Sequence, residues 1–115
     1  MHFIERQEGD VLILSIKGRL AGPPETDKLN ERIQNKINEN KTKIVLNLKN
    51  IHWMSSLGIG AIMRNLRAVR EAGGDLRLTG LSEKIKDIFQ ITKLIGVIQT
   101  FATDQEAVKS FTSQN

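Results

Sequence analysis

Runs of apolar side chains mark the first strands of a predicted sheet. In Lys43–Leu48 the apolar residues Ile44, Val45 and Leu46 fill successive positions, and Leu48 follows after Asn47. Consecutive side chains of a strand point to opposite faces, so this run is typical of a strand buried on both faces, as in a parallel sheet. Val11–Ile16 is a similar run, which Gly18 is expected to close. Phe3–Arg6 is predicted to pair with it across a turn at Glu8–Asp10.

Two further strands are predicted in the second half of the chain. Leu76–Gly80 follows the glycine pair Gly73-Gly74, and Val97–Phe101 is a last, short strand. Ile51–Ser56 is expected to connect the strand at Lys43–Leu48 to a helix.

Helices are predicted where apolar residues recur every three or four positions. The four sets are Leu29, Ile33 and Ile37; Ile59, Ile62, Met63, Leu66 and Val69; Ile85, Ile88 and Phe89; and Ala107 with Phe111. Ser82 is placed to cap the third helix. Thr103 and Glu106 stand at the spacing of a capping box before the fourth.

The order of these elements predicts the fold class. After the first hairpin, strands and helices alternate, which is typical of an α/β domain with helices covering a mostly parallel sheet. We therefore expect residues 1–115 to form a single small α/β domain. It should contain a mixed, mostly parallel sheet of about five strands and about four helices.

Composition removes several classes of function. The 115-residue chain has no cysteine and only two histidines, which excludes a disulfide framework and thiol chemistry and makes a metal site unexpected. No apolar run approaches the roughly 18–20 residues that span a bilayer, and no signal peptide is readable, so a cytoplasmic protein without membrane contact is expected. The net charge of +4 comes from interspersed charges, and aromatic residues make up only 4%. Both features favour a solvated surface over nucleic-acid binding.

Candidate chemistry concentrates in Ile51–Gly60, which follows the most strand-like segment. Open α/β sheets place functional sites at this end of their strands, and the amino end of the following helix favours anions. Either Ser55 or Ser56 can cap that helix. Gly58 and Gly60 allow close approach by backbone or by a partner.

Enzyme chemistry is not supported by the same segment. The glycines lack the third glycine and the lysine of phosphate-binding loops. Neither serine lies in a Gly-x-Ser-x-Gly motif, and His52 has no third group to orient it as a base. We therefore expect no catalytic residue, no metal and no cofactor.

Three kinds of side chain in and after this segment have more than one interpretation. His52 is expected to be exposed in a polar loop. Trp53 is expected to be a core or half-buried side chain, and it would be a partner contact only if exposed. Arg64, Arg67 and Arg70 rise along the following helix, where the helix dipole alone favours cations near the carboxyl end.

The segments Lys43–Leu48 and Met54–Gly60 together resemble the central signature of bacterial anti-sigma factor antagonists. These proteins belong to the domain family shared with sulphate transporters, abbreviated STAS. Gly18–Leu20, Gly73-Gly74 and Thr103–Ala107 agree as well, so the resemblance covers nearly the whole chain. It implies a regulatory protein that binds an anti-sigma factor, itself an ATP-binding serine kinase, to release a sigma factor, and that is a monomer or weak dimer.

The resemblance also implies the site residues. The family signature reads Asp-Ser-Ser/Thr/Ala-Gly-Leu-Gly, and its phosphorylated serine falls on Ser56, with Gly58-Ile59-Gly60 on the Gly-Leu-Gly. Phosphate on Ser56 is then expected to switch partner binding. The implied partner contacts are Arg19, Ala21, Gly22, His52, Ser55, Ser56, Leu57, Gly58, Ile59, Gly60 and Arg64.

Two positions depart from the family pattern. Ser55 stands where the family has an aspartate before the serine, and Ala21 stands where a second aspartate is frequent. Three interpretations follow, in order of preference. The first is a phosphorylation-switched regulator, the second is a non-phosphorylated STAS scaffold in a regulatory assembly, and the third is a small nucleotide-binding protein that uses the Gly58–Gly60 turn.

Overall fold

A five-stranded mixed sheet forms the centre of the computed structural model, which describes residues 1–112. The strands lie in chain order: β1 (His2–Glu8), β2 (Val11–Leu20), β3 (Lys43–Met54), β4 (Asp75–Thr79) and β5 (Thr100–Phe101). The first pair is antiparallel, and each later pair is parallel. The predicted fold class is confirmed.

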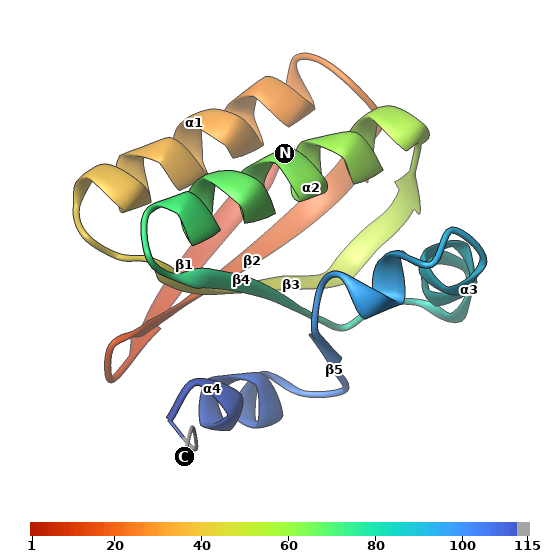
Figure 1. The fold of residues 1–115 in the computed structure, drawn as a ribbon. Coiled ribbons are helices and arrows are strands. Elements are labelled where there is room, and N and C mark those ends of the chain that lie inside the picture. The colour runs from red at the N-terminus through yellow and green to blue at the C-terminus, as the bar shows by residue number, and fades with distance from the viewer. Residues whose placement is uncertain (113–115) are drawn as a thin grey trace.

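The helices cover the sheet unequally (Figure 1). One face carries α1 (Glu25–Asn38) and α2 (Ser56–Glu71), and the opposite face carries α4 (Asp104–Thr112). Beside β4 and β5 lie α3 (Glu83–Ile91) and the short 3-10 turn η1 (Leu94–Gly96). The predicted caps are present. The Ser82 hydroxyl accepts from the Ile85 N–H, and Thr103 and Glu106 accept from each other's backbone N–H groups.

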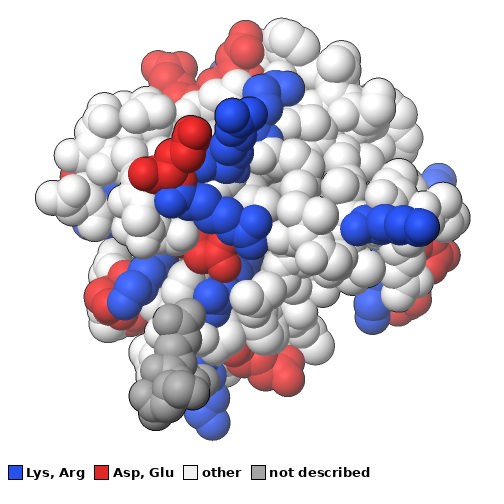
Figure 2. Space-filling model, in the orientation of Figure 1, with Lys and Arg blue, Asp and Glu red and all other residues white. Residues whose placement is uncertain are grey.

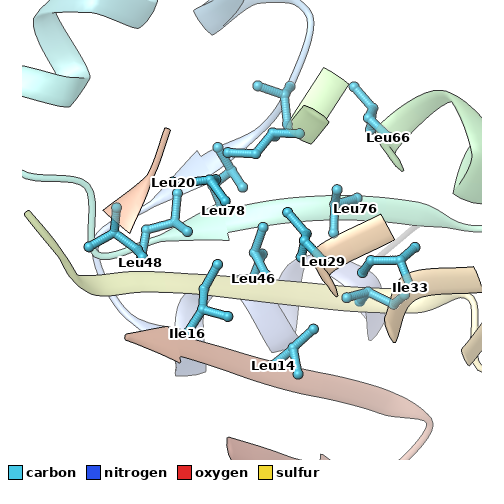
Figure 3. Close-up of a cluster of buried hydrophobic side chains, with 14 of the residues drawn as sticks. Leu14, Ile16, Leu20, Leu29, Ile33, Leu46, Leu48, Leu66, Leu76 and Leu78 are labelled. Carbon is cyan, nitrogen blue, oxygen red and sulfur yellow. The ribbon is translucent and has the colours of Figure 1, made fainter. Parts of the chain in front are cut away.

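The two central strands are buried on both faces, as their apolar runs predicted. Figure 3 shows the larger core, in which Leu14 and Leu46 of the sheet lie with Leu29 and Ile33 of α1 and Leu66 of α2. A second, smaller core lies under α4. It consists of Val11, Ile13, Val45, Ala107 and Phe111. The helices α1 and α2 cover one face of the sheet, whereas α4 covers only part of the opposite face. Part of that opposite face is therefore exposed to solvent.

Both central strands extend further than the sequence analysis predicted. β2 does not close at Gly18 but reaches Leu20, and the predicted connection after Leu48 is strand as far as Met54. The pairing continues because β3 contains irregularities that let it use extra residues against β2. In this stretch every third residue is buried, whereas a half-buried strand normally has every second residue buried. The sequence pattern therefore does not indicate a strand here.

The last strand is shorter than predicted. Val97 lies outside it, in the turn after η1, where its N–H bonds to the Leu94 carbonyl and its own carbonyl accepts from Arg70. Only Thr100–Phe101 pairs with β4. The backbone groups of Val97 are therefore satisfied without a sheet.

An ion-pair cluster joins α1 to the edge strand β1. The Glu5 carboxylate accepts from Lys36 at 2.7 Å and from Arg32 at 2.7 Å. The bond from Lys36 is the main reason why the pKa of Glu5 is lowered, and the same bond raises the pKa of Lys36. Lys36 is nearly buried, so Glu5 supplies the compensation that its charge needs.

The amino end of α2 lies directly against the carboxyl end of β2. Gly58 is buried there, and a Cβ atom at this position would overlap the carbonyl oxygen of Leu20. Gly60, two residues further along, has room, because its Cβ would meet only the Arg64 guanidinium at 3.5 Å. The contact at Gly58 therefore sets how closely the helix start approaches the strand end.

We predict opposite effects for alanine at these two glycines. Gly58→Ala should destabilise the fold by about 1–3 kcal/mol, because the helix must move away from β2. Gly60→Ala should stabilise it by up to about 1 kcal/mol, because alanine loses less backbone entropy in a helix. Urea unfolding of the two variants checks this, and equal effects would contradict the proposed close packing.

The Glu5 cluster predicts a pH dependence of stability. Because the pKa of Glu5 is lowered, its contribution is fully present above the ordinary glutamate pKa of about 4.3 and is lost as pH falls through the lowered value. Glu5→Gln should cost about 1–2 kcal/mol at neutral pH and little in acid. Glu8→Gln is the control, since Glu8 makes only an exposed pair with Arg6. Chemical unfolding at both pH values measures the difference, and an equal loss at both would contradict the role of Glu5.

Candidate functional site

Ser55 ties together the segments that build the predicted site. Its hydroxyl oxygen accepts from the backbone N–H groups of Leu57 at 3.1 Å and Gly58 at 3.4 Å, as the N-cap of α2. The same hydroxyl donates to the Ala21 carbonyl at 2.7 Å. The Ser55 N–H also bonds to the Leu20 carbonyl at 3.1 Å. The ends of β2 and β3 and the start of α2 are therefore fixed by one residue.

Ser56 is the first residue of α2 and is exposed. Within residues 1–112 its hydroxyl has no hydrogen-bond partner, because Ser55 already performs the capping. The sequence left either serine as the cap, and the structure assigns that role to Ser55. Ser56 thus presents a free hydroxyl at the start of a helix whose next N–H groups, those of Leu57 and Gly58, are capped by Ser55.

Neighbouring predicted contacts gather around Ser56. Leu57 is 59% exposed and lies beside Gly22, whose Cβ would come within 3.1 Å of the leucine side chain. Ile59 and Gly60 are half-buried in the first turns, and Arg64 is exposed one turn later. We name as the α2 surface the residues Ala21, Ser56, Leu57, Ile59, Gly60 and Arg64; Gly22 itself is buried.

Gly58 does not belong to the α2 surface. It is buried against Leu20 and is used to bring backbone onto backbone. Its backbone N–H group bonds to Ser55. The arrangement offers no open glycine cradle for a phosphate.

Arg19 and His52 are not grouped with Ser56 either. Leu20 and Met54 point into the core under α1 and α2, so Arg19 and Trp53, which precede them, project from the opposite face of the sheet. The Arg19 guanidinium lies 4.8 Å from the centre of the Trp53 ring. His52 is exposed beside them, as predicted.

The expectation of a core or half-buried Trp53 is wrong, because the structure places this residue among the exposed ones. The side chain is 42% exposed, and the Arg19 guanidinium lies over its ring. The spacing of Leu48, Ile51 and Met54 leaves pairs of residues between buried positions, but only the pairing with β2 shows that this spacing belongs to a bulged strand. That spacing leaves Trp53 outside.

The charge around the α2 surface favours an anion at its edge. No acidic residue lies in the first turn of α2, and no carboxylate of residues 1–112 pairs with Arg64. Further along, Arg67 pairs with Glu71 at 3.7 Å and Arg70 with Asp75 at 2.9 Å. Figure 2 shows this mixed band of basic and acidic side chains. Positive potential therefore remains near the start of the helix.

Other chemistry finds little support in the described part of the chain. Residues 1–112 contain no group of three or more histidine, aspartate or glutamate side chains placed to hold a metal ion. Within the same residues no helix has the length and apolar content needed to cross a bilayer.

Comparisons with known proteins agree with the fold and with the resemblance. The STAS domain family model matches residues 2–107. The anti-sigma-B factor antagonist of Bacillus subtilis (strain 168) is 34% identical over 62 residues, covering 54% of this chain and 57% of that protein. A second relative, from Thermotoga neapolitana, matches over 65% of its length. The chain thus spans less than two-thirds of the curated relatives it matches first.

Solved structures share the whole fold at low identity. The protein TM1081 has a TM-score of 0.86 at 22% identity, covering 99% of this chain and 91% of that one. The anti-sigma factor antagonist SpoIIAA in its unphosphorylated form has a TM-score of 0.75 at 20% identity, covering 98% and 100%. The phosphorylated form of the Bacillus protein SpoIIAA has a TM-score of 0.72, covering 96% and 99% at 20% identity. Because the family model matches residues 2–107, the chain belongs to the STAS domain family, among relatives that include anti-sigma factor antagonists.

Proposed function

We propose that this chain is an anti-sigma factor antagonist that binds an anti-sigma factor through the α2 surface and is switched by phosphorylation of Ser56. The partner is an ATP-binding serine kinase that also holds a sigma factor, and binding of the chain releases that sigma factor. The chain acts in the cytoplasm as a binding protein, without catalysis and without a cofactor of its own.

The observation that carries the proposal is the division of work between the two serines. Ser55 is committed to the fold by its bonds to Ala21, Leu57 and Gly58. Ser56 is exposed, so a kinase can reach its hydroxyl without unfolding the helix. A modification at Ser56 therefore acts on the surface and leaves the packing of α2 in place.

Electrostatics explains how such a phosphate can act as a switch. It adds nearly two negative charges at neutral pH. The dipole of α2 favours these charges by about 0.3–1 kcal/mol, so the fold tolerates them. A partner that covers Ser56 would desolvate them without a paired cation, at a cost of several kcal/mol, or about a thousandfold in affinity.

The rest of the α2 surface supports protein binding. Leu57 is an exposed apolar side chain directly after Ser56, of the kind that anchors interfaces when a partner covers it. Arg64 adds a cation that can steer an acidic partner. Both lie on a rigid helix start, which lowers the entropy cost of docking.

A second candidate, a STAS scaffold that is not phosphorylated, is favoured by Ser55 and Ala21. The family resemblance implies carboxylates at these positions, and neither residue can supply one. Ser55 keeps the capping role and adds a bond to the Ala21 carbonyl that a carboxylate could not donate. Such a scaffold would bind its partners with the same affinity whether or not ATP is present.

The phosphorylation site is directly testable. The chain is incubated with ATP and anti-sigma factors of the ATP-binding kinase class, and the phosphate is mapped by mass spectrometry. We predict a single phosphate on Ser56 and none on the Ser56→Ala variant. A phosphate on another residue, or none with every kinase tried, would contradict the switch and favour the scaffold.

The two serines should separate stability from binding. Ser55→Ala should destabilise the fold by about 1–2 kcal/mol, because it removes the cap and the bond to Ala21. Ser56→Ala should change stability by less than about 0.5 kcal/mol. Urea unfolding measures both, and a large loss for Ser56→Ala would show that Ser56 has a structural role.

A phosphate mimic tests the effect on the partner. Ser56→Glu should keep native stability but bind the anti-sigma factor at least about tenfold more weakly than Ser56→Ala. Calorimetric titration with the purified partner gives both affinities. Equal affinities for the two variants would reject the charge mechanism.

A further inference from the structure

β3 contains two bulges, and they affect the face of the sheet that lies opposite α1 and α2. Between the pairs Ser15–Asn47 and Lys17–Asn50, β2 advances by two residues and β3 by three. Between the pairs Gly18–Ile51 and Arg19–Trp53, β2 advances by one residue and β3 by two. In each step β3 uses one residue more than β2. Bulges of this kind often re-aim side chains near functional sites.

The bulges place four side chains of β3 on one surface. Leu48, Ile51 and Met54 are buried in the core under α1 and α2, and the residues between them are exposed. Each bulge adds one residue to β3, so two residues, rather than one, lie between successive buried positions. The exposed residues are Lys49, Asn50, His52 and Trp53.

Neighbouring strands extend this surface. His2 and Ile4 of β1 lie beside Lys17 and Ser15 of β2 in the antiparallel pairing, and a shallow cavity of about 270 Å³ opens between them and Asn50. Arg19 follows on β2, stacked on Trp53. We name as the open sheet face the residues His2, Ile4, Lys17, Arg19, Lys49, Asn50, His52 and Trp53.

The helix on this side of the sheet does not cover these residues. α4 packs on Val11, Ile13 and Val45, near the amino ends of β2 and β3. Ile4 remains 70% exposed and Trp53 42% exposed. An apolar residue and the single tryptophan of the chain are therefore left in solvent next to charged side chains.

The open sheet face carries positive charge without compensation. Within residues 1–112, Lys17, Arg19 and Lys49 form no ion pair. The nearby carboxylates are engaged elsewhere: Glu5 binds Lys36 and Arg32 on the other face, and Asp104 accepts from Asn47 and Thr79. Three uncompensated cations around exposed apolar groups complement an acidic ligand.

We propose that the open sheet face binds an acidic segment of a partner protein. The carboxylates of that segment pair with Lys17, Arg19 and Lys49, and separate apolar residues of the segment pack on Ile4 and on Trp53. A nucleic acid fits this surface less well. Trp53 is its only Phe, Tyr or Trp residue, and Arg19 already lies over that ring; the remaining rings are the small imidazoles of His2 and His52, whereas single strands stack successive bases on several large rings.

This surface is separate from the α2 surface and does not depend on phosphorylation of Ser56. The two surfaces meet at the carboxyl ends of β2 and β3, because Trp53 precedes Ser55 by two residues. A partner docked on the α2 surface can therefore extend an acidic segment across the edge of the sheet.

The single tryptophan makes the proposal measurable on the free chain. A short polyglutamate peptide is titrated into the chain at low salt while the fluorescence emission of Trp53 is recorded. We expect the emission to change with peptide concentration and to reach a plateau when the surface is saturated. The change should vanish near about 0.5 M salt, where exposed charges are screened. The double variant K17E/K49E should weaken binding by about tenfold or more.

A matched variant distinguishes an effect at the open sheet face from a general effect of the net charge of the chain. K84E/K86E makes the same charge change at two exposed lysines of α3, and it should alter peptide affinity by less than about twofold. Circular dichroism confirms that both variants are folded. Equal weakening by both pairs, or no emission change with the native chain, would overturn the proposal. Tighter binding of an oligodeoxythymidine than of polyglutamate would also overturn it and assign the surface to nucleic acid.

Discussion

The close contact between the start of α2 and the end of β2 is the constraint on which the site depends. Gly58 allows the helix backbone to rest on the Leu20 carbonyl, and Ser55 then closes the junction with its bond to Ala21. With any larger residue at position 58, the helix start would move outward. The exposure of Ser56 follows from this geometry, because the cap and the buried glycine occupy the inward positions.

A second constraint concerns β3. This strand runs through the middle of the molecule, yet it also exposes polar side chains to solvent. Near its amino end, β3 is buried on both faces between α1, α2 and α4. In the part of β3 that α4 does not cover, Leu48, Ile51 and Met54 are buried in the core, and the residues between them are exposed to solvent because of the bulges. One strand therefore contributes to the core from both faces in its first half and from one face in its second half.

Much of the fold could be predicted from local patterns. The helices followed from three-and-four spacing, and the first half of β3 followed from its apolar run, because each pattern reflects burial against neighbouring elements. The exposed position of Trp53 and the second half of β3 could not be predicted that way. Bulges depend on the pairing with β2, which is a non-local interaction, and they replace the two-residue period with one of three. The same limit applies to the serines, because the choice of Ser55 as cap depends on the distant Ala21 carbonyl.

The two surfaces differ in how they can be regulated. At the α2 surface, charge can be changed covalently, since Ser56 has a free hydroxyl at a helix end that accepts anions. At the open sheet face, charge is fixed by lysine and arginine and responds only to the salt and acidity of a partner. A partner that spans both would lose contacts at Ser56 on phosphorylation while keeping those at Lys17 and Lys49. Its affinity would then be reduced to that of the remaining surface instead of being abolished.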